Sequence, residues 1–492
     1  MNDTPQQPHV VYYGWCYRPH SNFKAYWFSP SNPFEVHLPL DWRTTEVSPS
    51  LLPTGPDGSP SLTALIAGHE DVSSWVRGGY GFVGAGRYIV IRTTGGPDRV
   101  QKLRNAWRHV IKDSSWQDPL RRPGTGPVAI GAITFSPTSY TYSILEIPRV
   151  IVGLDAQGAW VTTVREKPRK HPDPVDVLAD IRRFVARPAS FRAPRTLSVL
   201  PASEQDWRGV LPEDEWVRRV AAAQERMRAG EAQKVVMARA ALVDVRPRPH
   251  VGEVIHALAQ RNPTAWTYGI QAMVGASPEM LLDLEDGRVF SRVLAGTARR
   301  HVDPATDPRQ AAEEVARLSA WLRSSDKNVR EHDLARASAV QALEPLCRGV
   351  QASDPFVLVL PRVLHLATDV TAHVAGDTGA LALVDALHPT AAVCGTPRQA
   401  AGRIIEELEG LSRKFYAGPV GWVDWHGEGQ WCIAIRGAQI PPIPVHSIGV
   451  TGVGPVTVYG GSGIMPDSDP DDELAETRAK MRTVMDALES AS

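Results

Sequence analysis

MLLDLEDGRVFSRVLAG, residues 280–296, places two apolar stretches on either side of an Asp-Gly pair. Asp-Gly accommodates the left-handed backbone of a tight two-residue turn, and apolar stretches of this length suit buried strands. The sequence therefore predicts an antiparallel hairpin here. Parallel neighbours would need a long crossover instead of a two-residue turn, so this hairpin argues against an all-parallel sheet.

Strands and helices alternate on both sides of this hairpin. KVVMARAALVDV (234–245) and TAWTYGIQAMVG (264–275) predict strands before it. Further strands are expected at 356–374, 417–426, 430–440 and 448–459, and helices at 212–230, 308–346, 397–410 and 470–488. Strand pairs alternate with helices without a strict βαβ order, which favours an α+β fold over a Rossmann sheet.

The first 200 residues differ in character from the rest. They are rich in Trp, Pro and Gly, with strands expected at 86–94 and 126–135. Residues 187–207 are rich in Pro, Ser and Arg, which is typical of a connector. We therefore expect a β-rich N-terminal portion over residues 1–205 and a second portion, with sharper patterns, over residues 206–492.

Composition narrows the class of protein. The chain has 492 residues and a formal net charge of −1, which disfavours a nucleic-acid-binding protein, since such proteins usually have a basic face. Its four cysteines form no CxxC pair, so neither a disulfide framework nor a zinc site is expected. The sequence shows no signal peptide and no stretch of roughly 20 apolar residues that could cross a bilayer. We expect a cytoplasmic protein without a nucleic-acid or membrane partner.

Two residues are candidates for acid–base chemistry. Lys234 is the only lysine between Lys170 and Lys327, and it begins an apolar strand. A lysine that is partly buried there can act as a base, although an exposed lysine at a strand edge is the alternative. Glu279, in GASPEM, comes at the head of the apolar segment MLLDL. Such a carboxyl is a candidate general acid with a raised pKa, and a solvated glutamate in a turn is the alternative.

Three glutamates are candidates for metal binding. Glu473 and Glu476 are three residues apart on one face of an expected helix, and Glu331 lies on another helix with Asn328 three residues before it. A few carboxylates with oxygen-only ligation suit Mg²⁺, which keeps waters and shares substrate oxygens. The alternative is an exposed helix face on which Glu476 pairs with Lys480.

Two further features are candidates for binding an anion. YGGSG (459–463) is glycine-rich and follows an expected strand, and such a turn can present backbone N–H groups to a carboxylate. Arg436 lies in the apolar stretch WCIAIRGAQI, where its guanidinium needs a partner. A bidentate substrate carboxylate or a structural ion pair would each serve.

Ten short segments occur in the order and roughly the spacing of one known family. They are AQKVVMAR (232–239), GASPEMLL (275–282), LAGTARR (294–300), SDKNVREHDL (325–334), LHLATDV (364–370), HPTAAVCGTP (388–397), YAGPVGWVD (416–424), IAIRGAQI (433–440), YGGSGI (459–464) and ELAETRAKM (473–481). From about residue 205 to 490 the chain resembles the chorismate-utilising enzymes, and most closely the isochorismate synthases. The resemblance implies a large chorismate-binding fold of layered antiparallel sheets flanked by helices, with the catalytic region in residues 206–492.

The resemblance also implies a role for each matching residue. Lys234 matches the base that activates water for attack at C2 of chorismate, and Glu279 matches the acid that protonates the departing C4 hydroxyl. Glu331 and Glu476 match ligands of Mg²⁺, with Glu473 beside the metal. Substrate-binding positions are matched by Gly296, Thr297, His365, Ala392, Val393, Arg436, Gly461 and Lys480.

The residue at position 234 separates members of this family. Members that use ammonia typically have Gln there, because ammonia needs no base, and no amidotransferase segment is evident here. Lys234 therefore favours water and the formation of isochorismate, with chorismate as the substrate and no amidotransferase subunit as partner. Salicylate synthesis with loss of pyruvate, amine transfer to C2 and a non-catalytic relative are the alternatives.

Four positions depart from the usual pattern of the family. Asn328 stands where an acid is usual near the metal, and Cys394 and Thr396 also differ from the common residues. Val393 replaces a larger Leu. A smaller wall would let isochorismate adopt the conformation for pyruvate loss, so we expect mainly isochorismate with some lyase activity.

Overall fold

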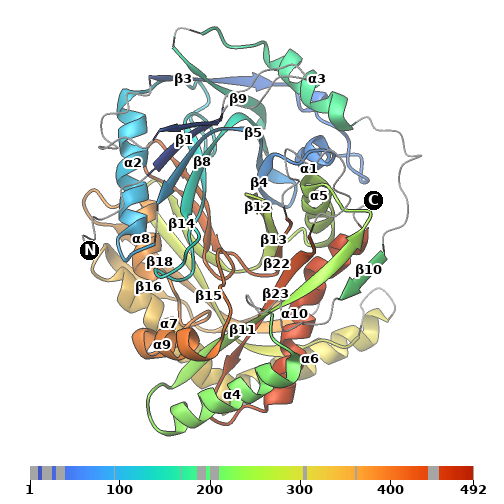
Figure 1. Cartoon of the computed structure of the whole chain (residues 1–492), viewed down its shortest axis with the longest axis vertical. Helices are drawn as coiled ribbons and strands as arrows, with labels where there is room; N and C mark the ends of the chain where they lie inside the picture. Colours follow the sequence, from blue (N-terminus) through green and yellow to red (C-terminus); the bar gives the residue numbers. More distant parts are fainter. Residues whose placement is uncertain are drawn as a thin grey trace.

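The computed structural model describes residues 9–13, 25–28, 39–93, 95–167, 169–185, 196–199, 210–302, 307–360, 363–441 and 454–490. In these ranges twenty-three strands form one hydrogen-bonded network, with helices packed around it (Figure 1). The strand pairs of this part are antiparallel except for β3 (Leu40–Val47) with β6 (Ser115–Gln117). The predicted α+β class is confirmed. The boundary expected near residue 205 lies outside the described residues.

The N-terminal portion is an antiparallel meander. β4 (Val72–Arg77), β5 (Tyr80–Thr93), β8 (Ser143–Asp155) and β9 (Gly158–Glu166) pair in that order, and β9 continues to β3. The remaining elements are β1 (His9–Tyr13), β2 (Ala25–Phe28), α1 (Leu62–Ile66), α2 (Arg99–Asp113), β7 (Val128–Ala132), α3 (Pro174–Val185) and β10 (Thr196–Val199). The strands expected at 86–94 and 126–135 correspond to β5 and β7.

The C-terminal portion is built on two long antiparallel pairs. β11 (Lys234–Arg246) pairs with β23 (Val456–Ile464), and β15 (Arg288–Arg299) pairs with β18 (Val363–Val374). The other strands are β12 (Trp266–Ile270), β13 (Met273–Ser277), β14 (Met280–Glu285), β16 (Cys347–Ala352), β17 (Phe356–Val359), β19 (Gly395–Thr396), β20 (Pro419–Asp424), β21 (Gly429–Ile433) and β22 (Gly437–Gln439).

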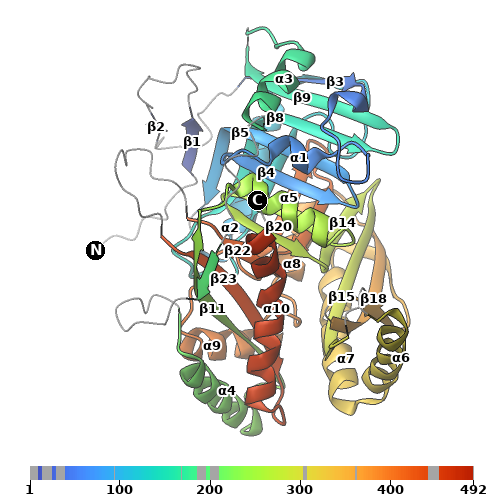
Figure 2. The same cartoon turned by 90° about the vertical axis from the view of Figure 1, so that its right-hand side faces the viewer.

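Helices surround these pairs. They are α4 (Glu213–Arg228), α5 (Val251–Arg261), α6 (Pro308–Ser324), α7 (Asp326–Leu343), α8 (Ala380–Leu387), α9 (Arg398–Leu408) and α10 (Pro470–Ser490). Figure 2 shows β11, β23, α4 and α10 on one side of the lower half, and β15, β18, α6 and α7 on the other. No helix of the described residues is long and apolar enough to span a membrane.

In the described residues three strand pairings join the N-terminal and C-terminal portions. β4 pairs with β12, with Trp75 opposite Tyr268, β7 pairs with β20, with Gly131 opposite Gly421, and β10 pairs with the end of β11. The sheet therefore continues from one portion into the other, so the N-terminal strands help to fix the strands that carry the candidate site.

The hairpin at 280–296 is confirmed. β14 and β15 are joined by Asp286 and Gly287, whose φ angles of 50° and 71° are those of a tight left-handed turn. The segment 264–275, expected as one strand, is itself a hairpin of β12 and β13. Its turn residues Gln271 and Ala272 also have positive φ angles, of 50° and 59°, although neither residue type signals such a turn.

Four other expectations need correction. The segment 356–374, expected as strand, contains two strands, β17 and β18, which pair with each other in antiparallel fashion. The helix expected at 308–346 is two helices, because Ser325 ends α6 and then begins α7 with its Oγ 3.4 Å from Asn328 N. The strand expected at 430–440 is interrupted at Arg436, where φ is 53°. YGGSG (459–463) is no turn, because it forms the second half of β23 and pairs with β11.

The glycines of that strand have a packing reason. A Cβ on Gly460 would come within 2.7 Å of Thr477 O on α10, and one on Gly463 within 2.8 Å of Glu331 Oε1. Side chains at these positions would therefore push away both α10 and a candidate metal ligand. The run is glycine-rich because neighbouring elements approach the strand closely.

Candidate active site

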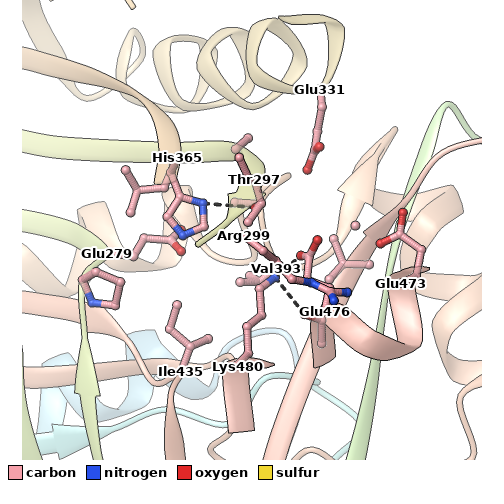
Figure 3. Close-up of a pocket in the computed structure, with 18 of the residues that line it drawn as sticks. Glu279, Thr297, Arg299, Glu331, His365, Val393, Ile435, Glu473, Glu476 and Lys480 are labelled. Carbon is pink, nitrogen blue, oxygen red and sulfur yellow. Dashed lines mark hydrogen bonds and ion pairs between the residues drawn. The ribbon is translucent and has the colours of Figure 1, made fainter. Parts of the chain in front are cut away.

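One cavity of about 570 Å³ collects the predicted residues. Its lining comes from β11, β15, β18, β23, α6, α7 and α10, together with the segments around Glu279, Val393 and Arg436. Figure 3 shows side chains from several of these elements around the cavity, among them Glu279, His365, Glu331 and Glu476. The predicted residues that line it are Glu279, Thr297, Glu331, His365, Ala392, Val393, Arg436, Gly461, Glu473, Glu476 and Lys480.

Lys234 and Gly296 are the two predicted residues outside this lining. Gly296 has a φ of 77°, and a Cβ there would come within 3.1 Å of Asn328 Cβ. The register of β15 and β18 shifts at this point. Gly296 therefore lets β15 pass α7 closely and turns the next residue, Thr297, into the cavity.

Lys234 is a buried lysine, so the alternative of an exposed strand-edge side chain is wrong. It is 1% exposed, and its Nζ lies 2.8 Å from Glu331 Oε1. The ion pair offsets the cost of removing an ammonium from water. Lys234 is thus connected to the cavity through Glu331, which does line it.

Glu279 is held between β13 and β14 by its backbone. Its N–H donates to Ser277 Oγ at 3.2 Å, and its carbonyl accepts from Ile433 N at 3.1 Å. The residue is 6% exposed, so it is no solvated turn glutamate. Burial raises the pKa of its carboxyl to about 7, against the opposing charges of Lys234, Lys480 and Arg436. Such a group can hold a proton near neutral pH and donate it.

Three carboxylates on α7 and α10 each have a lysine partner. Besides the pair of Glu331 with Lys234, Glu473 Oε1 lies 3.0 Å from Lys327 Nζ, and Glu476 Oε1 lies 2.6 Å from Lys480 Nζ. Burial raises the pKa of Glu473. Burial also acts to raise the pKa of Glu476, but the ammonium of Lys480 outweighs it and lowers that pKa to about 2. The pairing of Glu476 with Lys480 was expected for an exposed face, whereas here it lies in the cavity.

These carboxylates fit a hard divalent cation. In the described residues no three His, Cys, Asp or Glu side chains are already grouped as a metal site. Glu331, Glu473 and Glu476 nevertheless line one cavity, and Gly463 leaves the space beside Glu331 that a Cβ would fill. Carboxylates from two helices, with room for water and substrate oxygens, suit Mg²⁺. Asn328 is engaged elsewhere, since its Nδ2 donates to Ser325 Oγ at 2.9 Å.

Arg436 is a buried cation without a carboxylate. It is 7% exposed, and among the described residues the one hydrogen bond of its side chain runs from Nη2 to His365 Nε2 at 3.4 Å. In the described part of the chain no ion pair to it exists, so the alternative of a structural ion pair is wrong. Burial lowers the pKa of Arg436. Its left-handed backbone lies between β21 and β22, and its side chain lines the cavity.

His365 is uncharged beside this arginine. Burial, together with the charges of Arg436 and Lys480, lowers its pKa to about 3. Its Nδ1 lies 3.1 Å from Thr297 Oγ1 (Figure 3). A neutral imidazole here adds no counter-charge for Arg436, so an anionic ligand remains the partner that the arginine lacks.

Gly461 lies where β23 faces α10. Its carbonyl accepts from Lys480 Nζ at 2.9 Å, and a Cβ on it would lie 3.1 Å from Tyr416 Oη. In a strand the N–H and C=O of one residue point the same way. The N–H of Gly461 therefore also points away from β11, toward the lysine side of the cavity.

Sequence reasoning missed several residues of the lining. Tyr416 is buried and stacks on Tyr459 at 4.9 Å, and Lys327 pairs with Glu473. Ile435 and Trp321 also line the cavity, and Trp321 is 49% exposed. Tyr416 begins a quoted motif and Lys327 lies inside one, so position within a motif was the available signal. Trp321, in an ordinary helix, carried none.

Comparison with known proteins decides the family. Residues 75–489 match the model of the chorismate binding enzyme family. The chain belongs to this family. The match begins well before the first quoted motif, so most of the N-terminal portion is part of the family's fold.

Relatives within the family carry isochorismate synthase names. Isochorismate synthase MenF of Bacillus subtilis (strain 168) is 27% identical over 427 residues, which cover 82% of this chain and 85% of that protein. Isochorismate synthase EntC of Escherichia coli (strain K12) is 30% identical over 372 residues, 74% of this chain and 81% of that protein. The structure of MenF, the menaquinone-specific isochorismate synthase of Escherichia coli, aligns with a TM-score of 0.63 at 22% identity, covering 92% and 97% of the two chains. This last likeness shows the fold.

Proposed function

We propose that the protein is an isochorismate synthase that converts chorismate to isochorismate. The proposal is carried by two buried residues, Glu279 and Lys234. Glu279 lines the cavity and is readily protonated, and Lys234 is paired with Glu331, which also lines it. Water attack at C2 needs a base, and loss of the C4 hydroxyl needs an acid. One group of each kind is available.

The proposed step balances atoms and protons. Water forms the new O–C2 bond and gives its proton to Lys234. The two ring double bonds then shift from C1=C2 and C5=C6 to C1=C6 and C4=C5, and the C4–O bond breaks. Glu279 protonates the departing hydroxyl, which leaves as water. Lys234 must be neutral and Glu279 protonated at the start. Burial raises the pKa of Glu279 to about 7, which favours its protonated form.

Binding of the dianion is assigned to the cationic side chains. Arg436 takes one substrate carboxylate, for which it has no protein competitor. Lys480 and the N–H of Gly461 lie near one another and suit the same kind of group. Ala392, Val393 and Ile435 supply apolar wall against the ring.

Mg²⁺ is the proposed cofactor. Glu331 and Glu476 would hold it, with Glu473 beside them, and the ion would neutralise and orient a substrate carboxylate. The lysines that now pair with these carboxylates would have to share them. The chain thus supplies the negative charge that a cation needs next to an anionic substrate.

The test is product analysis by chromatography after incubation with chorismate and Mg²⁺. We expect isochorismate from the native chain, none after removal of Mg²⁺ with EDTA, and loss of about 10²–10⁴ in rate for Lys234→Ala. No turnover with chorismate and Mg²⁺ would leave a non-catalytic relative. A product that requires ammonium would instead show amine transfer to C2.

Salicylate synthesis is the second candidate, because of the wall at Val393. This residue is buried and lines the cavity with a short side chain. The same chromatogram decides the matter. Stoichiometric salicylate and pyruvate from the purified protein would replace isochorismate synthesis by salicylate synthesis as the main activity.

A further inference from the structure

In the described residues, one edge of β11 has no strand neighbour from Val236 to Leu242, because β10 pairs only with Val243–Arg246 on that edge. β19 pairs only with Lys234 and Val235, whereas β23 pairs along the other edge as far as Val243. Val236 N donates to Cys394 O at 2.8 Å, so the backbone groups of Val236 point away from β23. Those of Ala238, two residues on, point the same way.

A buried Glu–Arg pair satisfies this edge. Glu409 Oε2 accepts from Ala238 N at 2.7 Å, and Arg413 Nη2 donates to Val236 O at 2.7 Å. The two side chains are 1% and 2% exposed and are joined by Arg413 Nε to Glu409 Oε1 at 2.6 Å. Trp216 Nε1 completes the edge by donating to Ala238 O at 3.1 Å.

The same arginine also holds the segment that runs beside the start of β11. Arg413 Nη1 donates to Val393 O at 2.8 Å, and in the described residues this is the one hydrogen bond to that carbonyl. Val236, Ala238, Val393 and Arg413 all line the cavity. One planar guanidinium thus ties the backbone at Val393 to that of β11, which a lysine's single ammonium could not do in the same way.

We propose that Glu409 and Arg413 are positioning residues that fix the wall of the substrate cavity formed by β11 and the adjacent Val393. This inference rests on the proposed function for its kinetic consequence. Neither residue reaches the reacting atoms in this role, because their bonds go to backbone groups of the wall. Their loss should weaken substrate binding more than turnover, since Lys234 keeps its pairing with β19 and with Glu331.

The test compares Arg413→Lys with a matched control, Arg219→Lys. Arg219 also pairs with a glutamate one helical turn away, Nε to Glu215 Oε1 at 2.7 Å, and also donates to a backbone carbonyl, Leu408 O at 3.0 Å, but it lies away from the cavity. We expect KM for chorismate to rise about tenfold or more in Arg413→Lys, with a smaller fall in kcat. Arg219→Lys should leave both unchanged.

Glu409→Gln is the second variant, because it keeps the side-chain shape should Arg413→Lys fail to fold. It should raise KM in the same direction. Hydrogen exchange adds a readout that needs no turnover, with faster exchange expected at 235–239 and 390–394 and not elsewhere. A folded Arg413→Lys or Glu409→Gln protein with native KM overturns the proposal. Absence of turnover in the native chain contradicts the proposed function instead, and exchange then decides whether the pair holds the wall.

Discussion

Two glutamates of the cavity, Glu279 and Glu476, have opposite electrostatic surroundings. Glu279 is buried and Glu476 is largely buried. Glu476 has Lys480 Nζ at 2.6 Å, whereas in the described part of the chain no cation is hydrogen-bonded to the Glu279 carboxyl. The pKa of Glu476 is lowered to about 2, and that of Glu279 is raised to about 7. Carboxyl groups whose environments separate their pKa values in this way suit different tasks. Glu476 suits holding a cation, and Glu279 suits giving a proton.

The same contrast extends to the two sides of the cavity. The carboxylates of α7 and α10 are matched by Lys234, Lys327 and Lys480. Arg436, on the other side, has only a neutral histidine. Leaving a buried cation unpaired costs folding stability, and functional sites commonly carry such costs. The unmatched side is therefore where the anionic ligand is expected to complete the charge balance.

Of the variants considered for the two sides of the cavity, Glu279→Gln should lower the activity most. The amide cannot donate a proton to the leaving hydroxyl, so kcat should fall by about 10²–10⁴. In the native enzyme, activity should decline as the pH rises through about 7, because Glu279 then loses its proton. A pH–rate profile checks both, and the variant should lack this limb. An unchanged decline near pH 7 in Glu279→Gln would assign the limb to another group.

The stability of the folded protein should also depend on pH through Glu279. The pKa of Glu279 is raised from 4.5 to about 7 on folding, so the folded state binds the proton more tightly. Its contribution is fully present below pH 4.5 and is lost as the pH rises through about 7. The midpoint of thermal unfolding can be measured against pH for Glu279→Gln and for the native chain. The contribution of Glu279 is the difference between the two slopes over this range.

Arg436→Met should have the next largest effect and should separate function from stability. Without the guanidinium, kcat/KM for chorismate should fall about a hundredfold, the value of a charge-assisted hydrogen bond in a buried site. Without ligand, the variant should be more stable than the native chain, with a free energy of unfolding higher by about 1 kcal/mol. The reason is that an apolar side chain replaces an unpaired buried cation. Steady-state kinetics and denaturant unfolding measure the two. A loss of stability in Arg436→Met would show that the arginine has a structural partner.

From the sequence, the residues that line the cavity could be predicted better than the backbone conformation that positions them. The residue types of Asp286 and Gly287 predicted their turn. The motifs also singled out glutamates that are distant in the sequence and that line one cavity in the structure. The turn at Gln271-Ala272 and the break at Arg436 carry no such local signal, since tertiary contacts hold these residues at positive φ. Nor could spacing show that glycines at 459–463 are strand residues, because the reason is the approach of α10 and Glu331.

The smallest expected effect comes from removing the lysine that pairs with Glu473, Lys327. This change tests whether the carboxylates of α7 and α10, each paired with a lysine, are arranged to bind a cation. In Lys327→Met, Glu473 remains buried without its partner at 3.0 Å, so the chain without metal should be less stable. Mg²⁺ should then restore more stability than it adds to the native chain, because it replaces the lost charge. The extra rise in the midpoint of thermal unfolding should be about 2 °C. Lys102→Met is the control, since Lys102 pairs with Asp98 at 3.1 Å on α2, away from the cavity. If Mg²⁺ raises the midpoint of the native chain, Lys327→Met and the control equally, Glu473 takes no part in holding the ion, and the cation would then rest on Glu331 and Glu476 alone.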